Sequence, residues 1–233
     1  MDKPVHILVV EDDNDLNHLL CSILRKSGYV PQSAYSGTEA LLYLEKQEWN
    51  MVLLDLMLPG KTGEELLHIL SQRKESIQMP VIIISAKGEQ QTKIAALRGG
   101  ADDFITKPFD IEEVSARIDS HLRRYKRIPA EARSNKLQHK TITLDQDAQT
   151  VHIQGIEVTF TSREFDILAL LLSSPKKIFT KANVYESVWG EPYFGDDNTI
   201  NVHVSNLRSK LAKASPNEEF IETVWGMGYR LKA

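Results

Sequence analysis

Four short apolar segments in the first half of the chain each end in side chains that could take part in chemistry. These groups are the acids Glu11, Asp12 and Asp13, the acid Asp55, the hydroxyl of Ser85 and the amine of Lys107. In an open parallel sheet, ligands gather outside the carboxyl ends of the strands. If the apolar segments are parallel strands, the four groups therefore meet on one rim of the sheet.

Carboxylates crowded on one rim repel each other, and the pKa of each is raised unless a cation relieves the repulsion. Mg2+ suits such a site, because it prefers oxygen ligands and keeps water molecules that a phosphate can replace. Lys107 adds a point positive charge that can meet a phosphoryl group, and Ser85 can donate a hydrogen bond to a phosphoryl oxygen. The rim therefore predicts metal-assisted phosphoryl chemistry.

Two simpler interpretations of the acids remain open. The triplet Glu11-Asp12-Asp13 could be a solvated loop whose acids favour the N-terminus of a following helix. Asp55 lies in a strongly apolar stretch, where an unpaired charge costs several kcal/mol, and it could form a structural salt bridge with Lys107. The coincidence of reactive groups at four separate strand ends favours the phosphoryl site over both.

A second candidate site is the helix predicted over residues 199–213. Apolar residues recur there at helical spacing and predict one buried stripe, formed by Ile200, Val204, Leu207 and Leu211. The opposite side then carries His203, Asn206, Ser209, Lys210 and Lys213. Amide and cationic side chains can contact base edges and phosphates in the major groove of DNA. On composition alone, a solvated polar face is the simpler interpretation.

The elements that must position the first set alternate between strands and helices. Continuous apolar runs at residues 6–10, 51–54 and 81–84 are typical of strands covered on both faces, with weaker strands at residues 30–35 and 104–105. Amphipathic helices are predicted at residues 16–27, 37–47, 63–72, 91–98 and 111–125. This alternation predicts an α/β doubly wound domain with a five-stranded parallel sheet.

The pattern changes after a polar, aperiodic segment at residues 126–136, which contains a proline and is predicted to be a linker. Domains are therefore expected at residues 1–125 and 137–233. In the second, short strands near residues 142–144, 151–153 and 156–158 precede helices near residues 161–172, 181–189 and 199–214. A terminal hairpin at residues 220–231 contains Gly226 and Gly228, which indicate special backbone angles. The result is an α+β domain.

Composition sets the remaining bounds. The chain has 233 residues, of which 42% are apolar and 26% charged, as in ordinary globular proteins. Its net charge of −4 divides into −5 for residues 1–125 (14 Lys and Arg against 19 Asp and Glu) and +1 for residues 126–233 (14 against 13). No apolar run approaches the roughly 18–20 residues that span a bilayer, and no secretion signal is recognisable. A cytoplasmic location is expected, with the single cysteine, Cys21, in a core.

Four segments together resemble the receiver domain of bacterial two-component response regulators. They are Val9–Asp13, Leu54–Gly60, Ile84–Ala86 and Gly100–Phe109, in the order and spacing of that family. The resemblance covers residues 3–125 and implies the flavodoxin/CheY-like fold. It implies that Asp55 is the phosphoacceptor and that Lys107 and Ser85 assist the transfer.

The same resemblance implies a Mg2+ site and a switch. Asp12 would bind the metal directly and Glu11 through water, and Asp55 and the backbone carbonyl of Met57 would complete the protein ligands. Ser85 and Phe104 resemble the switch pair, in which the hydroxyl moves toward the acyl phosphate and the aromatic ring turns inward. Lys107-Pro108 is similar to the Lys-Pro of the family, whose peptide is usually cis.

The remainder of the chain, residues 137–232, resembles the winged-helix effector domain of the OmpR/PhoB family. The motifs that carry this resemblance are Tyr185–Gly190, Asp197–Leu211 and Ile221–Leu231. It implies that residues 199–213 enter the major groove, while the hairpin around residues 226–228 lies along the backbone or in the minor groove. The implied DNA-binding residues are Asn198, Thr199, His203, Asn206, Arg208, Lys210, Thr223 and Tyr229. Trp225 stands where relatives often carry arginine, so insertion of a cation there is not carried over; Tyr185 and Trp189 are expected in the core.

Together the two resemblances imply a phosphorylation-switched transcriptional regulator rather than a turnover enzyme. A sensor histidine kinase would phosphorylate Asp55, and two copies would then bind tandem half-sites of promoter DNA. The implied dimer interface consists of Lys93, Asp102, Asp103, Glu113, Arg117 and Arg124. RNA polymerase is a candidate further partner, and no membrane is expected.

Two rival functions would use the same residues. An aspartate-based phosphohydrolase usually needs a second carboxylate two residues after its nucleophile, and Met57 occupies that place. A phosphorylation-independent DNA-binding protein would have a degenerate receiver, whereas Asp12, Asp55, Ser85 and Lys107 form an intact set. Both rivals are therefore disfavoured.

Overall fold

The computed structural model describes the chain except residues 1–3, 74–78, 124–135, 194 and 196. Two compact units, Met1–Arg123 and Arg124–Ala233, make up the chain. The predicted linker at residues 126–136 lies outside the described residues except for Lys136. Each unit is described by itself below.

The first unit is built on a five-stranded parallel sheet with strand order β2-β1-β3-β4-β5. Its strands are β1 (His6–Val10), β2 (Val30–Ala34), β3 (Met51–Leu54), β4 (Val81–Ser85) and β5 (Asp103–Thr106). Every residue of the two strands β3 and β4 is buried, as expected for strands covered on both faces. The predicted doubly wound fold is confirmed.

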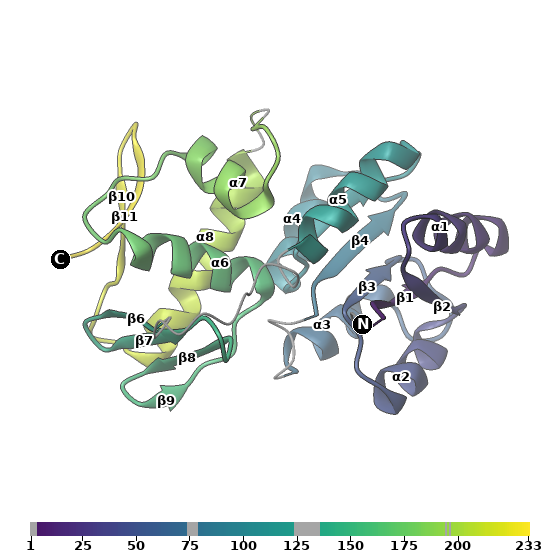
Figure 1. The fold of residues 1–233 in the computed structure, drawn as a ribbon, viewed down its shortest axis with the longest axis horizontal. Coiled ribbons are helices and arrows are strands. Elements are labelled where there is room, and N and C mark those ends of the chain that lie inside the picture. The colour runs from purple at the N-terminus through teal and green to yellow at the C-terminus, as the bar shows by residue number, and fades with distance from the viewer. Residues whose placement is uncertain (1–3, 74–78, 124–135, 194, 196) are drawn as a thin grey trace. The chain divides into compact units, whose positions relative to one another are not determined.

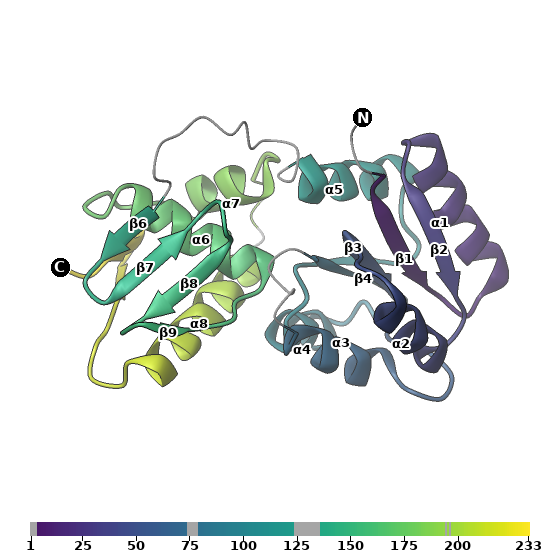
Figure 2. The same cartoon turned by 60° about the horizontal axis from the view of Figure 1, so that its bottom comes forward.

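Five helices cover the two faces of this sheet (Figure 2). They are α1 (Asn14–Lys26), α2 (Gly37–Lys46), α3 (Gly63–Ser71), α4 (Gln90–Gly99) and α5 (Ile111–Arg123). α1 and α5 contact each other on one face, and α2, α3 and α4 lie together on the other. Cys21 of α1 is fully buried, which confirms its expected place in the core.

Side-chain caps fix where three of these helices begin, and hence where the strand ends lie. Asp13 accepts a hydrogen bond from the backbone N–H of Leu16, and Ser36 caps α2 in the same way. At α3, Thr62 and Glu65 form a reciprocal capping box. The loops before α1 and α2 are short, residues 11–13 and 35–36, whereas the loop before α3 spans residues 55–62 and begins with Asp55.

The second unit contains a four-stranded antiparallel sheet, three helices and a hairpin (Figure 1). The sheet consists of β6 (Lys136–His139), β7 (Ile142–Asp145), β8 (Thr150–Ile153) and β9 (Ile156–Glu157), and the hairpin of β10 (Ile221–Val224) and β11 (Gly228–Leu231). β6 was not predicted, because Leu137 is its one apolar residue and no alternation marks it. Backbone pairing with β7 supports this edge strand.

The helices of the second unit are α6 (Ser162–Ser173), α7 (Lys181–Trp189) and α8 (Asp197–Ala214). α6 begins as predicted, with Glu164 accepting a hydrogen bond from the backbone N–H of Thr161. Tyr185 and Trp189 of α7 stack on each other inside the unit, as expected. α8 packs against both other helices, so more than one side of it is buried. Among the helices in the described part of the chain, none combines the length and hydropathy needed to cross a bilayer.

Candidate phosphoacceptor and nucleic-acid-binding sites

The strand-end groups of the first unit meet as the sequence predicts. The ammonium Nζ of Lys107 lies 2.6 Å from Oε2 of Glu11 and 2.5 Å from Oδ2 of Asp55. Glu11 and Asp55 are 2% and 5% exposed. Two buried carboxylates therefore share one cation. Without that cation, each buried charge would be left uncompensated, which is strongly unfavourable.

The protonation equilibria of this cluster reflect burial and pairing. Burial raises the pKa of Glu11, and this effect outweighs the opposing influence of the hydrogen bond from Lys107. Burial alone would lower the pKa of the Lys107 amine, but its hydrogen bonds to Asp55 and Glu11 raise that pKa above the ordinary value. Lys107 is therefore charged over the whole physiological pH range.

The acids also fit a divalent cation. Glu11, Asp12 and Asp55 each offer one carboxylate oxygen, and these three atoms lie within 4.8 Å of one another. Asp12 is exposed, so the group opens to solvent on one side and could accept a metal ion that keeps water ligands. Asp13 does not join the group, because its carboxylate caps α1. The helix-cap interpretation thus holds for Asp13 alone.

The loop after β3 presents the acceptor carboxylate. Oδ1 of Asp55 accepts a hydrogen bond of 2.9 Å from the backbone N–H of Met57, whose side chain is 54% exposed. Gly63 allows this loop to pass close to the start of α3, because a β-carbon at position 63 would collide with the backbone oxygen of Asp55. This role of Gly63 was not predicted; the signal available was a glycine at the start of α3, eight residues after the acid.

The remaining receiver residues lie on β4, on β5 and just after β5. Ser85 is fully buried at the end of β4, and its hydroxyl accepts a hydrogen bond of 3.4 Å from the backbone N–H of Lys87. Phe104 in β5 is 4% exposed, so its ring lies inside the unit. The Lys107-Pro108 peptide is cis, as the resemblance implies.

The residues predicted to form the dimer interface include both exposed and buried side chains. Asp102 is 1% exposed, and its carboxylate accepts a hydrogen bond from the backbone N–H of Val81. Asp102 thus holds the start of β4 and is enclosed in a single copy, as is Asp103 at 4% exposure, and this burial disfavours the predicted place of Asp102 in a dimer interface. Arg117 pairs within the chain with Asp103 at 2.9 Å and with Glu113 at 3.0 Å.

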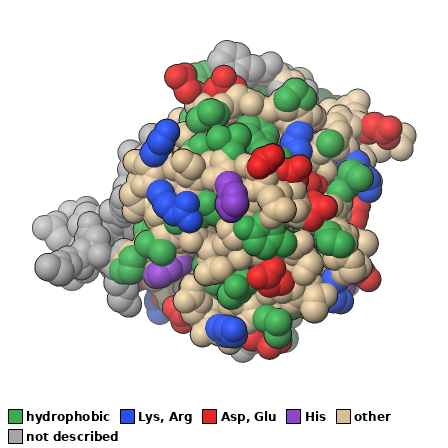
Figure 3. All heavy atoms as spheres, turned by 90° about the vertical axis from the view of Figure 1, so that its right-hand side faces the viewer, with side chains coloured by type: hydrophobic (Ala, Val, Ile, Leu, Met, Phe, Trp, Pro, Cys, Tyr) green, Lys and Arg blue, Asp and Glu red, His purple; other side chains and the backbone are tan. Residues whose placement is uncertain are grey.

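Two predicted interface residues remain, Lys93 and Arg124. Lys93 of α4 is partly exposed, and Arg124 lies outside the described residues. Figure 3 shows a different face of this unit, the side on which α1 and α2 lie in Figure 1, and acidic and basic side chains are interspersed there.

In the second unit, the exposed stripe of α8 agrees only in part with the one predicted. His203 is 1% exposed and lies against Trp189, with 5.5 Å between the ring centroids, and Thr199 is 3% exposed. Both residues are enclosed because α8 packs on α7 as well as α6, and this burial disfavours their predicted place on the DNA-facing side. The exposed positions of the helix are Asn198, Asn201, Ser205, Ser209, Ala212 and Lys213. Asn201 and Ser205 are therefore candidates that were not predicted from the sequence.

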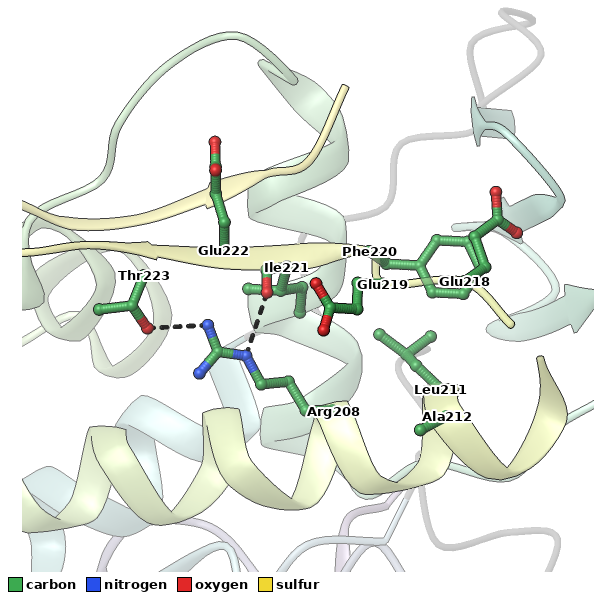
Figure 4. Close-up of a pocket in the computed structure, with 9 residues that line it drawn as sticks. All are labelled: Arg208, Leu211, Ala212, Glu218, Glu219, Phe220, Ile221, Glu222 and Thr223. Carbon is green, nitrogen blue, oxygen red and sulfur yellow. Dashed lines mark hydrogen bonds between the residues drawn. The ribbon is translucent and has the colours of Figure 1, made fainter. Parts of the chain in front are cut away.

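Two cations of α8 contact other parts of the unit. Lys210 lies 2.6 Å from the carboxylate of Glu164, which is 1% exposed. Arg208 donates hydrogen bonds to the backbone oxygen of Ile221 at 3.2 Å and to the hydroxyl of Thr223 at 2.9 Å (Figure 4). Lys210 thus anchors α8 to α6, and Arg208 joins it to the hairpin.

Arg208 also borders a cavity of about 460 Å³ between α8 and β10 (Figure 4). Three acids, Glu218, Glu219 and Glu222, line this cavity. Such acids repel phosphates, so the part of the cavity that they line is unsuited to contact with the DNA backbone.

The base of the hairpin is held from two further sides. The hydroxyl of Tyr229 donates a hydrogen bond of 2.7 Å to Asn201 of α8, and Tyr229 is 6% exposed. Its backbone N–H and C=O both pair with Phe179, each at 2.9 Å. Gly228 lies next to this backbone pairing of Phe179 with Tyr229, and its φ of 141° is a conformation that suits glycine.

Comparison with known proteins finds relatives of both units. Residues 7–119 match the response regulator receiver domain family, and residues 155–231 match the family described as transcriptional regulatory protein, C terminal. The uncharacterized transcriptional regulatory protein YcbL of Bacillus subtilis (strain 168) is 37% identical over 96% of this chain and 99% of its own length. The phosphate regulon transcriptional regulatory protein PhoB of Rhizobium meliloti (strain 1021) is 37% identical over 97% of this chain and 98% of its own length.

Solved structures match nearly the whole length of the chain. A mutant form of RitR matches with a TM-score of 0.80 at 27% identity, covering 98% of this chain and 99% of the other. DrrB of Thermotoga maritima, an OmpR/PhoB homologue, shares the fold with a TM-score of 0.52 and 24% identity. The chain is thus a response regulator with a DNA-binding output domain that regulates transcription. Within that class, it belongs to the OmpR/PhoB family.

Proposed function

We propose that Asp55 accepts a phosphoryl group from a sensor histidine kinase and that the modified protein dimerises on promoter DNA. The observation that carries the proposal is the shared contact of Lys107 with the buried carboxylates of Glu11 and Asp55. A carboxylate beside a fixed cation can act as a nucleophile toward an anionic phosphoryl group, because the cation offsets the repulsion between them.

The chain's own residues position this transfer. A carboxylate oxygen of Asp55 attacks phosphorus; the new O–P bond forms as the N–P bond of the phosphohistidine breaks, and the imidazole nitrogen keeps the electron pair. Lys107 remains beside the developing acyl phosphate, and Ser85 can donate a hydrogen bond to a phosphoryl oxygen. Mg2+, held by Glu11, Asp12, Asp55 and the Met57 carbonyl, would neutralise charge on the phosphoryl oxygens.

The acceptor role is tested by incubating the purified protein with Mg2+ and a small acyl phosphate. We expect one phosphoryl group per chain, detected by intact-protein mass spectrometry and removed by hydroxylamine. Asp55→Asn should abolish the modification. Asp13→Asn is the matched control, because it neutralises a nearby acid while keeping a helix-capping side chain. Equal modification of the Asp55→Asn protein would refute the assignment.

Dimerisation is assigned to the α4, β5 and α5 surface, without Asp102. Arg117 pairs with Asp103 and Glu113 inside one chain, so a dimer would have to share or exchange these pairs across a two-fold axis. We expect phosphorylated protein to sediment as a dimer and Arg117→Glu protein to remain monomeric although it is phosphorylated. A phosphorylated Arg117→Glu dimer would exclude this surface.

DNA contact is assigned to the exposed stripe of α8 and to the hairpin. Asn198, Ser205 and Asn206 offer hydrogen-bonding groups suited to base edges, and Thr223 at the hairpin is exposed. RNA polymerase remains a candidate partner of the DNA-bound dimer. Duplexes selected by the phosphorylated protein from a random pool should carry two direct half-sites; failure to select any duplex would refute DNA recognition by this unit.

A further inference from the structure

The helix that follows β1 carries a fully buried amide on its apolar side. Asn17 is 0% exposed and lies in α1 with Leu20, Cys21 and Leu24, which are also buried. A buried amide is unfavourable unless its donors and its acceptor find partners. An asparagine among the core residues of α1 therefore needs a specific set of hydrogen bonds.

The amide of Asn17 has partners for both of its polar atoms. Its Nδ2 donates a hydrogen bond of 3.0 Å to the backbone oxygen of Glu11 and one of 3.3 Å to the backbone oxygen of Ala34. Its Oδ1 accepts a hydrogen bond of 3.5 Å from the thiol of Cys21. Glu11 directly follows β1 and Ala34 ends β2. The amide thus joins the carboxyl ends of two strands.

The bond to Glu11 acts on two acids at once. The oxygen that accepts it belongs to the peptide unit between Glu11 and Asp12, and this unit is planar, so its orientation fixes where both side chains begin. The backbone N–H of Glu11 donates a hydrogen bond of 3.0 Å to the oxygen of Ala34. Glu11 is therefore held by its backbone on both sides of its α-carbon, and Asn17 supplies one of the two holds.

We propose that Asn17 is a positioning residue for the divalent cation: its amide sets the peptide between Glu11 and Asp12 so that both carboxylates face Asp55. The carboxylate oxygens of these three acids lie within 4.8 Å of one another. Groups that orient the ligands of a metal typically contribute about 10- to 100-fold to its affinity. The inference rests on the proposed metal-assisted phosphoryl transfer to Asp55.

Magnesium binding and phosphoryl transfer separate positioning from stability. Mg2+ is titrated into the full chain by isothermal calorimetry, and modification by a small acyl phosphate is followed over a range of Mg2+ concentrations. Asn17→Ala should weaken Mg2+ binding about tenfold and raise the Mg2+ concentration for half-maximal modification by the same factor. The rate at saturating Mg2+ should stay within about twofold of the wild type, because Asp55 and Lys107 are unchanged.

Asp102→Ala is the matched control. It also removes a buried polar side chain from the first unit, but it acts at the start of β4, at the end of the sheet away from the acids. This variant should bind Mg2+ as the wild type does. Asn17→Ser, which keeps one donor on a shorter side chain, should lie between Asn17→Ala and the wild type, and it replaces Asn17→Ala if the alanine protein does not fold.

Hydrogen exchange of the metal-free protein gives a measurement that does not depend on the cation. The backbone N–H of Glu11 should exchange faster in Asn17→Ala, while the N–H groups of β4 keep their protection. Unchanged Mg2+ affinity of the Asn17 variants would overturn the inference while leaving the phosphoacceptor site intact. Equal weakening by Asn17→Ala and Asp102→Ala, or faster exchange throughout the first unit, would assign Asn17 to general stability and would also overturn it. Failure of the wild-type protein to bind Mg2+ would instead refute the proposed metal site itself.

Discussion

Replacing Lys107 by methionine separates the electrostatic role of the lysine from its packing. Methionine keeps an unbranched side chain but removes the ammonium that lies 2.6 Å from Glu11 and 2.5 Å from Asp55. The carboxylate side chains are 3% and 6% exposed, so water cannot take over the lost contact fully. We therefore expect the first unit of the Lys107→Met protein to be less stable when no divalent cation is present.

The size of the effect follows from the spacing of the acids. The ligand oxygens of Glu11 and Asp55 lie within 4.8 Å, and two charges at that separation repel by about 3.5 kcal/mol at an effective dielectric constant of about 20. Protonation of Glu11, whose pKa burial already raises, relieves part of this repulsion. A loss of about 2–3 kcal/mol near neutral pH remains. In the wild type, Mg2+ must compete with the ammonium for the same two carboxylates, so Mg2+ should stabilise the variant more than the wild type.

Calorimetry of the full chain measures both effects, because Mg2+ identifies the transition of the first unit by shifting it. Without Mg2+, the transition of Lys107→Met should fall by about 8–12 °C, at roughly 4 °C per kcal/mol for a unit of this size. Saturating Mg2+ should recover most of that loss. Lys87→Met is the control, since Lys87 forms an exposed pair with Glu64 at 3.6 Å and its loss should cost about 0.5 kcal/mol or less. Equal stability of the Lys107→Met and wild-type proteins without metal, or equal stabilisation of both by Mg2+, would refute the reasoning.

Three further substitutions test individual contacts. Gly228→Ala forces a β-carbon into neighbouring backbone and should destabilise the second unit by about 2 kcal/mol or more in urea unfolding, whereas Gly155→Ala, which meets open space at φ of 80°, should cost about 1 kcal/mol. Glu164→Gln keeps a capping side chain but removes the buried charge beside Lys210, and should cost about 1–3 kcal/mol in the same assay, with no loss if the pair is dispensable. Asp102→Ala removes a buried acceptor and should lower receiver stability by about 1–2 kcal/mol without preventing dimerisation of phosphorylated protein in sedimentation; a specific dimerisation defect would restore this residue to the interface.

The residues on the rim of the first unit were predictable because each directly follows, in the sequence, the strand that positions it. An apolar run specifies a strand, the residue after it specifies what stands at the rim, and parallel strands bring their carboxyl ends together. Glu11, Asp55, Ser85 and Lys107 could therefore be placed without knowing the strand order. Gly63 escaped notice because its importance lies in a close approach to the backbone of another segment, which no periodicity records.

The face of α8 was only partly predictable, because one apolar stripe defines a solvent side only for a helix with one neighbour. α8 packs on α6, on α7 and beside the hairpin, so His203 is enclosed although it lies off the apolar stripe. The exposed positions shift to Asn201 and Ser205 as a result. Burial of a polar residue among several elements is a property of the tertiary structure and leaves no mark in helical spacing.

The number of basic residues on α8 was a poor guide to its DNA-binding surface, for a related reason. Whether a cation is available to DNA depends on acids that are remote in sequence: Lys210 meets Glu164 across 46 positions, just as Lys107 meets Glu11 across 96. The cations that suggested an electrostatic interface are therefore partly used to hold the unit together. DNA recognition by such a unit must depend more on hydrogen bonds and apolar contact, and its affinity should fall less steeply with salt than the number of basic residues on α8 implies.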